Sequence, residues 1–96
     1  MRLSEFEREA IKAVVTVLDP DAKVYLYGSR VDDSLRGGDI DLLVISDTLG
    51  FSDKITLLAE IKSRLGEQKI DLSIKKRAEL DEDAFVRSIL ATAIPL

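Results

Sequence analysis

A six-residue run, Ile40–Ile45, constrains the fold of this chain more than any other feature. Five of its residues are large and aliphatic, and only Asp41 interrupts them. A strand with so little alternation between apolar and polar residues is typical of the middle of a sheet, where both faces are covered. The run therefore predicts a central strand.

Two further strands are predicted, over Lys23–Tyr27 and Lys69–Ile74. The connection from the first of these to the central strand is short for a parallel crossover, so we expect that pair to be antiparallel. The connection from the central strand to the third strand contains a full helix, which favours a right-handed parallel crossover. The end of the first strand and the starts of the other two then meet at one edge of the sheet.

Three helices complete the pattern, over residues 4–18, from Ser52 or Asp53 to 65, and from 81 to a stop at Pro95. Ser4 and Glu7 form a capping-box pattern for the first helix. The apolar residues expected to face the core are Phe6, Ile11, Val14, Val15 and Leu18, then Ile55, Leu58, Ile61 and Leu65, then Phe85, Val86, Ile89, Leu90, Ala93 and Ile94. We predict one α+β domain over residues 1–96, with a mixed three- to four-stranded sheet flanked by helices in the order α-β-(α)-β-α-β-α.

Composition excludes several kinds of chemistry. The 96 residues include no cysteine and no histidine, so disulfides, thiolate nucleophiles, the usual zinc sites and an imidazole base are all ruled out. A net charge of −4 disfavours bulk attraction to nucleic acids or anionic membranes. No apolar run approaches the length of a membrane span, and the N-terminal residues are too acidic for a signal peptide. We expect a cytoplasmic protein that binds neither membrane nor nucleic acid directly.

Three aspartates occupy positions that are unusual for this residue type. Asp41 and Asp71 lie inside predicted strands, and Asp39 precedes Asp41 by two residues, which places both carboxylates on one face. Neighbouring strands are about 4.8 Å apart, so Asp71 at a similar register could approach that pair. Three carboxylates this close would repel one another, and one or two hard divalent cations, Mg²⁺ or Mn²⁺, would relieve the repulsion.

Each aspartate also has a purely structural interpretation. Asp39 follows two glycines and suits a turn, Asp41 could pair with Arg30 or Arg36, and Asp71 could face water from an edge strand. For any single residue the two interpretations are about equally weighted. The predicted convergence of all three at one edge favours the cation site.

Gly28 and Ser29 follow the first strand and are a second, weaker signal. A glycine at a strand-to-helix turn lets a phosphate approach free backbone N–H groups, and the Ser29 hydroxyl could donate to the same phosphate. A strand-ending glycine followed by a serine N-cap is the ordinary alternative.

Together these residues resemble a known family. Gly28-Ser29-Arg30, then Gly38-Asp39-Ile40-Asp41, then Asp71 on a later strand are similar to the signature of polymerase-β-type nucleotidyltransferases. The resemblance covers nearly the full length and is nearest to the minimal nucleotidyltransferase (MNT) proteins, the antitoxins of HEPN/MNT toxin–antitoxin systems.

The resemblance implies metal-assisted transfer of a nucleoside monophosphate, usually AMP from ATP, to a hydroxyl. It implies that Asp39 and Asp41 hold two Mg²⁺ ions, that Asp71 completes the first metal site and accepts a proton, and that Gly28, Ser29 and Arg30 hold the triphosphate. It also implies a HEPN-domain toxin as partner and acceptor. The alternative is an antitoxin of the same fold without catalysis, which silences its partner by occlusion.

Overall fold

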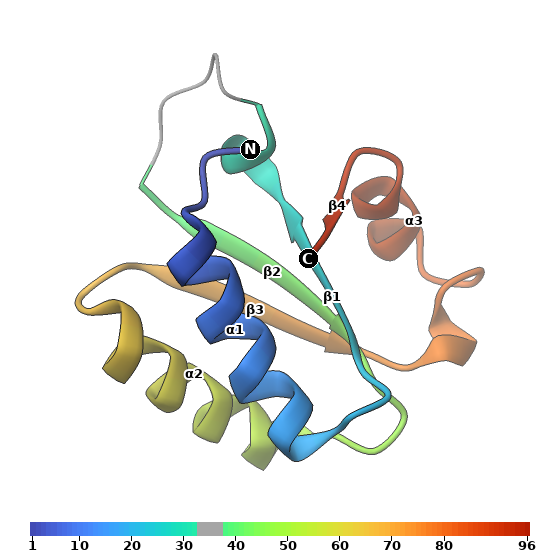
Figure 1. Ribbon diagram of the computed structural model, residues 1–96. Coiled ribbons are helices and arrows are strands. Elements are labelled where there is room, and N and C mark those ends of the chain that lie inside the picture. Colours follow the sequence, from blue (N-terminus) through green and yellow to red (C-terminus); the bar gives the residue numbers. More distant parts are fainter. Residues whose placement is uncertain (33–37) are drawn as a thin grey trace.

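The computed structural model describes residues 1–32 and 38–96, which form a four-stranded mixed sheet with helices against both faces (Figure 1). The elements in chain order are α1 (Glu5–Leu18), β1 (Lys23–Tyr27), the 3₁₀ helix η1 (Gly28–Val31), β2 (Ile40–Ile45), α2 (Phe51–Leu65), β3 (Ile70–Lys75), the 3₁₀ helix η2 (Arg77–Glu79), α3 (Ala84–Leu90) and β4 (Ile94–Pro95).

The sheet order is β3-β2-β1-β4, so the aliphatic run of β2 is central as predicted. The β1–β2 pair is antiparallel and the β2–β3 pair is parallel, and both predictions are confirmed. The C-terminal end of β1 and the N-terminal ends of β2 and β3 therefore lie at the same edge of the sheet. We call this edge the acidic rim, because Asp39, Asp41 and Asp71 lie along it.

Alternating residues of β2 face two different cores. Leu42 and Val44 lie in the larger core, which α1 and α2 close from one side of the sheet. Leu43 and Ile45 lie in a smaller core beneath α3 on the opposite side (Figure 1). All four side chains are at most 3% exposed. Burial on both faces explains why every residue of β2 after Asp41 is apolar.

The last helix was predicted to continue to Ile94, and this prediction is wrong. Helix α3 ends at Leu90, and the N–H groups of Thr92 and Ala93 close it by donating to the Ile89 carbonyl. The chain then turns back, and Ile94 pairs with Leu26 as the antiparallel edge strand β4. Proline has no N–H to donate, so Pro95 fits an edge strand as well as it fits a helix end.

Helix α2 starts earlier than predicted, and one of its four expected core residues faces solvent. Gly50 is its N-cap, and Asp53 accepts a hydrogen bond from the Gly50 N–H (2.7 Å), so neither Ser52 nor Asp53 is the cap. Ile55 was expected to face inward but is 59% exposed, whereas Leu57 and Ile61 are fully buried. Ile61 is buried as expected, and Leu58 and Leu65 pack against the larger core, so Ile55 is the one that departs from the prediction.

Helix α1 begins at its predicted capping box, in which Ser4 and Glu7 each bond the other's backbone N–H. Its expected core residues are buried except two: Phe6 is 67% exposed and Leu18 is 39% exposed. Among the residues that the structure describes, no helix combines the length and apolar character needed to cross a membrane.

Candidate functional site

Three polar side chains form a row across the acidic rim. In the register of the sheet, Tyr27 of β1 lies opposite Asp41 of β2, and Asp41 lies opposite Asp71 of β3. Residues in register on adjacent strands project to the same face, about 4.8 Å apart. The structure therefore confirms that Asp71 lies at the same register position as Asp41. Asp41 is half-buried on the inner strand and Asp71 is exposed on the edge strand.

Gly28 lies directly against the Asp41 carboxylate. A β-carbon built on Gly28 would be 2.2 Å from Asp41 Oδ2 and 3.1 Å from its Cγ, and the φ of Gly28 is +78°. Only glycine fits this position without strain, because both the backbone angle and the space exclude a side chain. The close approach shows that Gly28 and the Asp41 carboxylate lie side by side at the rim.

The Asp41 carboxyl is held in an environment that disfavours its charge. Burial raises its pKa, and the neighbouring carboxylates of Asp71 and Asp39 raise it further. Both neighbouring carboxylates therefore act on the small volume around Asp41. A cation in that volume would relieve both the desolvation and the repulsion.

The third aspartate, Asp39, points toward a lysine. Asp39 Oδ2 lies 3.8 Å from Lys69 Nζ, and their side chains are 48% and 81% exposed. Within residues 1–32 and 38–96, no three acidic groups are close enough in this structure to hold a metal ion together. Exposed ion pairs contribute about 0–1 kcal/mol of stability. Little free energy is therefore lost if a metal cation replaces the Lys69 ammonium group as the partner of Asp39. The oxygen-only donor set and the shared rim fit a hard divalent cation once Asp39 turns.

An aromatic wall borders the acidic rim, and the sequence did not reveal it. Burial raises the pKa of the Tyr27 hydroxyl, and the charges of Asp71 and Asp41 raise it further. The Tyr27 ring meets Phe85 of α3 edge-to-face, with ring centroids 6.3 Å apart. The sequence signal that could have identified Tyr27 is its position immediately before Gly28. In the predicted antiparallel pair this position lies opposite Asp41.

Arg30 does not point into the site. Its guanidinium donates to the backbone carbonyls of Arg2 (2.8 Å) and Gly38 (3.1 Å) and to Gln68 Oε1 (3.4 Å). Arg30 therefore ties the N-terminal segment to the residue that precedes Asp39. Ser29 lies in η1 beside Gly28, and its carbonyl accepts a bond from Arg2. Arg36, the other arginine considered as a partner for Asp41, lies outside the described residues.

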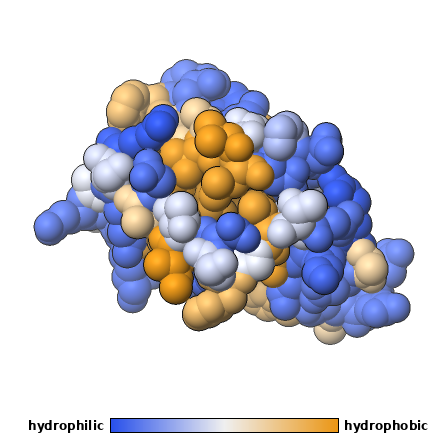
Figure 2. All heavy atoms as spheres, turned by 90° about the horizontal axis from the view of Figure 1, so that it is seen from below, coloured by the Kyte–Doolittle hydropathy of each residue, from blue (hydrophilic) through white to orange (hydrophobic). Residues whose placement is uncertain are grey.

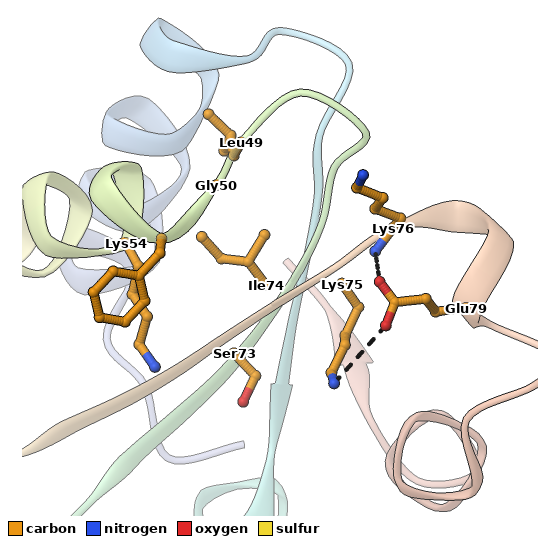
Figure 3. Close-up of a pocket in the computed structure, with 9 residues that line it drawn as sticks. Leu49, Gly50, Lys54, Ser73, Ile74, Lys75, Lys76 and Glu79 are labelled. Atoms are coloured by element: carbon orange, nitrogen blue, oxygen red, sulfur yellow. Dashed lines mark hydrogen bonds and ion pairs between the residues drawn. The ribbon is translucent and has the colours of Figure 1, made fainter.

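A separate pocket of about 320 Å³ lies beside the far half of β3 and the start of α2 (Figure 3). Its rim carries lysines, but Lys75 Nζ is 3.1 Å from Asp83 and 4.0 Å from Glu79. Because this cation is already neutralised by two carboxylates, the pocket offers less chemistry than the acidic rim. We place the candidate site at Gly28, Asp41 and Asp71.

Comparison with known proteins supports the same assignment. Residues 9–96 match the family model described as Polymerase beta, Nucleotidyltransferase. The match includes every rim residue described above. A comparison with curated proteins found no match.

Proposed function

Because the chain belongs to the polymerase β nucleotidyltransferase family, we propose that it transfers AMP, or another nucleoside monophosphate, from a nucleoside triphosphate to a hydroxyl on a partner protein. Members of this family typically use divalent metals and nucleoside triphosphates. The protein-modifying activity, the partner and the antitoxin role are the parts that this proposal adds.

One observation carries the proposal. Asp41 and Asp71 lie in register on parallel strands beside the glycine that packs against Asp41. Two carboxylates in this position concentrate negative charge where a triphosphate would have to bind, so they are useful only with a cation between them and the phosphates. Their placement beside Gly28 supports the proposal, because the proposed metal ligands and the proposed phosphate-binding turn are then neighbours.

Asp39, Asp41 and Asp71 would hold one or two Mg²⁺ ions, with Mn²⁺ as an alternative. The cation would neutralise the phosphate charge and make a bound hydroxyl more acidic. Phosphoryl transfer of this kind depends mainly on positioning and charge neutralisation.

The chain's own residues supply the positioning. Gly28 and Ser29 would hold the triphosphate through backbone N–H groups and the Ser29 hydroxyl. The acceptor oxygen forms a bond to the α-phosphorus, the bond from this phosphorus to the pyrophosphate oxygen breaks, and pyrophosphate leaves. Asp71 would take the proton of the acceptor hydroxyl, since it is the carboxylate on the exposed edge strand.

We propose a HEPN-domain toxin as the partner, with a tyrosine hydroxyl as acceptor. The support is that Asp71 is exposed on an edge strand, where an acceptor carried by another protein can reach it. Modification of the toxin would neutralise it, which is the role of an antitoxin.

The test is incubation with α-labelled ATP, Mg²⁺ and any HEPN-domain protein that proves to be encoded beside this chain. Label should appear on the HEPN protein with the natural chain and should be lost with Asp41→Asn or Asp71→Asn. Asp81→Asn is the matched control, because the Asp81 carboxylate is exposed and makes no hydrogen bond or ion pair with the described residues. If the Asp41→Asn chain still protects cells from the toxin, occlusion and not transfer is the mechanism.

A further inference from the structure

An apolar stripe runs along the outer side of α1 and is exposed at Phe6, Ala13 and Val17, whereas Ala10 is 7% exposed. Phe6, Ala10, Ala13 and Val17 follow one another at helical intervals of four, three and four residues. Phe6 is 67% exposed and Val17 is 80% exposed, although both lie on a helix whose opposite side is buried in the core. A helix with a second apolar side has more apolar surface than its own domain covers.

The stripe borders a groove between α1 and α2. Two open hollows lie along this line, of about 520 and 240 Å³, and Arg64 lines both of them. We call this surface the α1–α2 groove; it is formed by Phe6, Ala13 and Val17 of α1 and Thr56, Glu60 and Arg64 of α2. Figure 2 views the molecule from the lower side of Figure 1 and shows apolar residues gathered in the middle of that face within a polar surround.

Within residues 1–32 and 38–96, the charged side chains of the groove form no ion pair. Among the described residues, Glu60 and Arg64 make no ion pair within the domain, although they lie one turn apart on α2. Glu9, at the edge of the hollow next to Phe6, is also unpaired in the described part of the chain. The groove therefore offers both signs of charge beside an uncovered apolar stripe.

We propose that the α1–α2 groove is the interface with a second copy of this chain, in which the two α1 helices pack antiparallel about a two-fold axis. In such an interface residue i meets residue j and residue j meets residue i. The stripe is suited to this: Phe6 of each copy meets Val17 of the other, and the exposed Ala13 of each copy packs over the nearly buried Ala10 of the other. Small residues at the centre let the helices approach closely, and large residues fill the two ends.

The charges favour the same occupant. In a two-fold arrangement each Arg64 can meet Glu60 or Glu9 of the second copy, and both reciprocal pairs form at once. A groove that carries acid and base in this way is complementary to itself. The proposal does not depend on catalysis, because the groove lies on the side of the sheet covered by α1 and α2 whereas α3 covers the other.

The first test measures the mass of the full chain in solution by sedimentation equilibrium over a wide concentration range. We expect a concentration-dependent shift toward twice 10.7 kDa. Val17→Glu should abolish the shift while leaving the unfolding midpoint unchanged, because Val17 is 80% exposed. Ile55→Glu is the matched control, since Ile55 is also exposed (59%) but lies outside the groove, and it should still dimerise.

A charge exchange tests the reciprocal pairs. Arg64→Glu should weaken dimerisation about threefold or more, and the double change Glu60→Arg with Arg64→Glu should restore it. A double variant as weak as the single one overturns the pairing.

The second test uses the absence of cysteine to probe the direction of packing. A mixture of Phe6→Cys and Val17→Cys chains should form a disulfide-linked heterodimer under mild oxidation. Neither variant should cross-link with itself, because identical positions lie about 16 Å apart in the antiparallel register. Self-cross-linking of either variant, a monomer at every concentration, or a groove that binds only a different protein would each overturn the proposal.

Discussion

The carboxylate of Asp41 lies in the space that a side chain at Gly28 would occupy, with 2.2 Å between Asp41 Oδ2 and a β-carbon built on Gly28. Gly28 directly follows β1 and Asp41 is the second residue of the neighbouring antiparallel strand β2. The phosphate-binding turn and the metal-binding carboxylate of the proposed site are therefore fixed in position by direct contact.

Gly28→Ala should lower transferase activity about 100-fold. The new methyl group would displace the Asp41 carboxylate, and a shift of about 1 Å in a reacting group is enough for a loss of this size. The positive φ of +78° adds about 1–2 kcal/mol of strain, so the free energy of unfolding should fall as well. Activity and denaturant unfolding of the same preparation measure both effects.

Two other glycines separate the clash from the strain. Gly66 has φ +83° with nothing within 4 Å of a built β-carbon, and Gly38 has open space and no positive φ. Gly66→Ala should lose stability and keep activity, whereas Gly38→Ala should retain both. Full activity in Gly28→Ala would show that the contact with Asp41 does not matter.

Asp41→Asn should stabilise the metal-free protein at neutral pH. Because folding raises the pKa of Asp41 above its ordinary value of 3.8, the stabilising contribution of the neutral form is complete below pH 3.8. It is lost as the pH rises through the raised pKa. The unfolding midpoint of Asp41→Asn in the presence of a chelator should therefore exceed that of the natural chain at pH 7, and the difference should shrink toward pH 3.

Added Mg²⁺ should reverse this order. Binding to the folded state alone stabilises a protein by mass action, so the natural chain should gain stability with Mg²⁺ or Mn²⁺ concentration. Asp41→Asn should gain much less, and Asp81→Asn should behave like the natural chain. An equal gain in all three variants would place the cation elsewhere.

Arg30→Ala should destabilise the fold by about 1–3 kcal/mol. The change removes three hydrogen bonds that join Arg30 to Arg2, Gly38 and Gln68, and two of these leave carbonyls without their donor. Arg30→Lys should not restore stability, because an ammonium group cannot reproduce the planar fork. Arg87→Ala is the control, because Arg87 is exposed and its removal should leave the free energy of unfolding unchanged. If Arg30→Ala weakened ATP binding without affecting denaturant unfolding, Arg30 would be a phosphate ligand and not a clamp.

Ser46→Ala should cost about 1–3 kcal/mol with no direct effect on the acidic rim. The buried Ser46 hydroxyl donates to Asp19 and accepts from the N–H groups of Thr48 (3.2 Å) and Leu49 (3.1 Å). Ser46 holds the pKa of Asp19 below its ordinary value of 3.8, so this stabilisation is present above pH 3.8 and is lost as the pH falls. The difference from the natural chain should narrow in acid, and exposed Ser88→Ala should remain within about 0.5 kcal/mol at any pH.

The strand pattern was predictable because its signals are local. The aliphatic run of β2 and the lengths of the connections predicted the central position, the antiparallel pair and the parallel pair, and the structure confirms all three. The C-terminal segment was not predictable in this way. Leu90, Ala93 and Ile94 fit a helical stripe, but Ile94 pairs with the otherwise unpaired edge of β1 and forms a strand there. A free sheet edge exists only after the rest of the sheet has formed.

The sequence by itself determined which residues could carry the chemistry. It contains no imidazole and no thiol, and it places aspartates inside strands, where a buried carboxylate is costly unless it is paired. Only the tertiary structure decided how those groups face one another. It brought Asp71 into register with Asp41 and packed Gly28 against Asp41, but it turned Asp39 toward Lys69 and Arg30 toward the backbone of Gly38. The physical reason is that the tendency of a segment to form a strand depends on its own residues and their spacing. The partner of each side chain depends instead on which distant segment folds beside it.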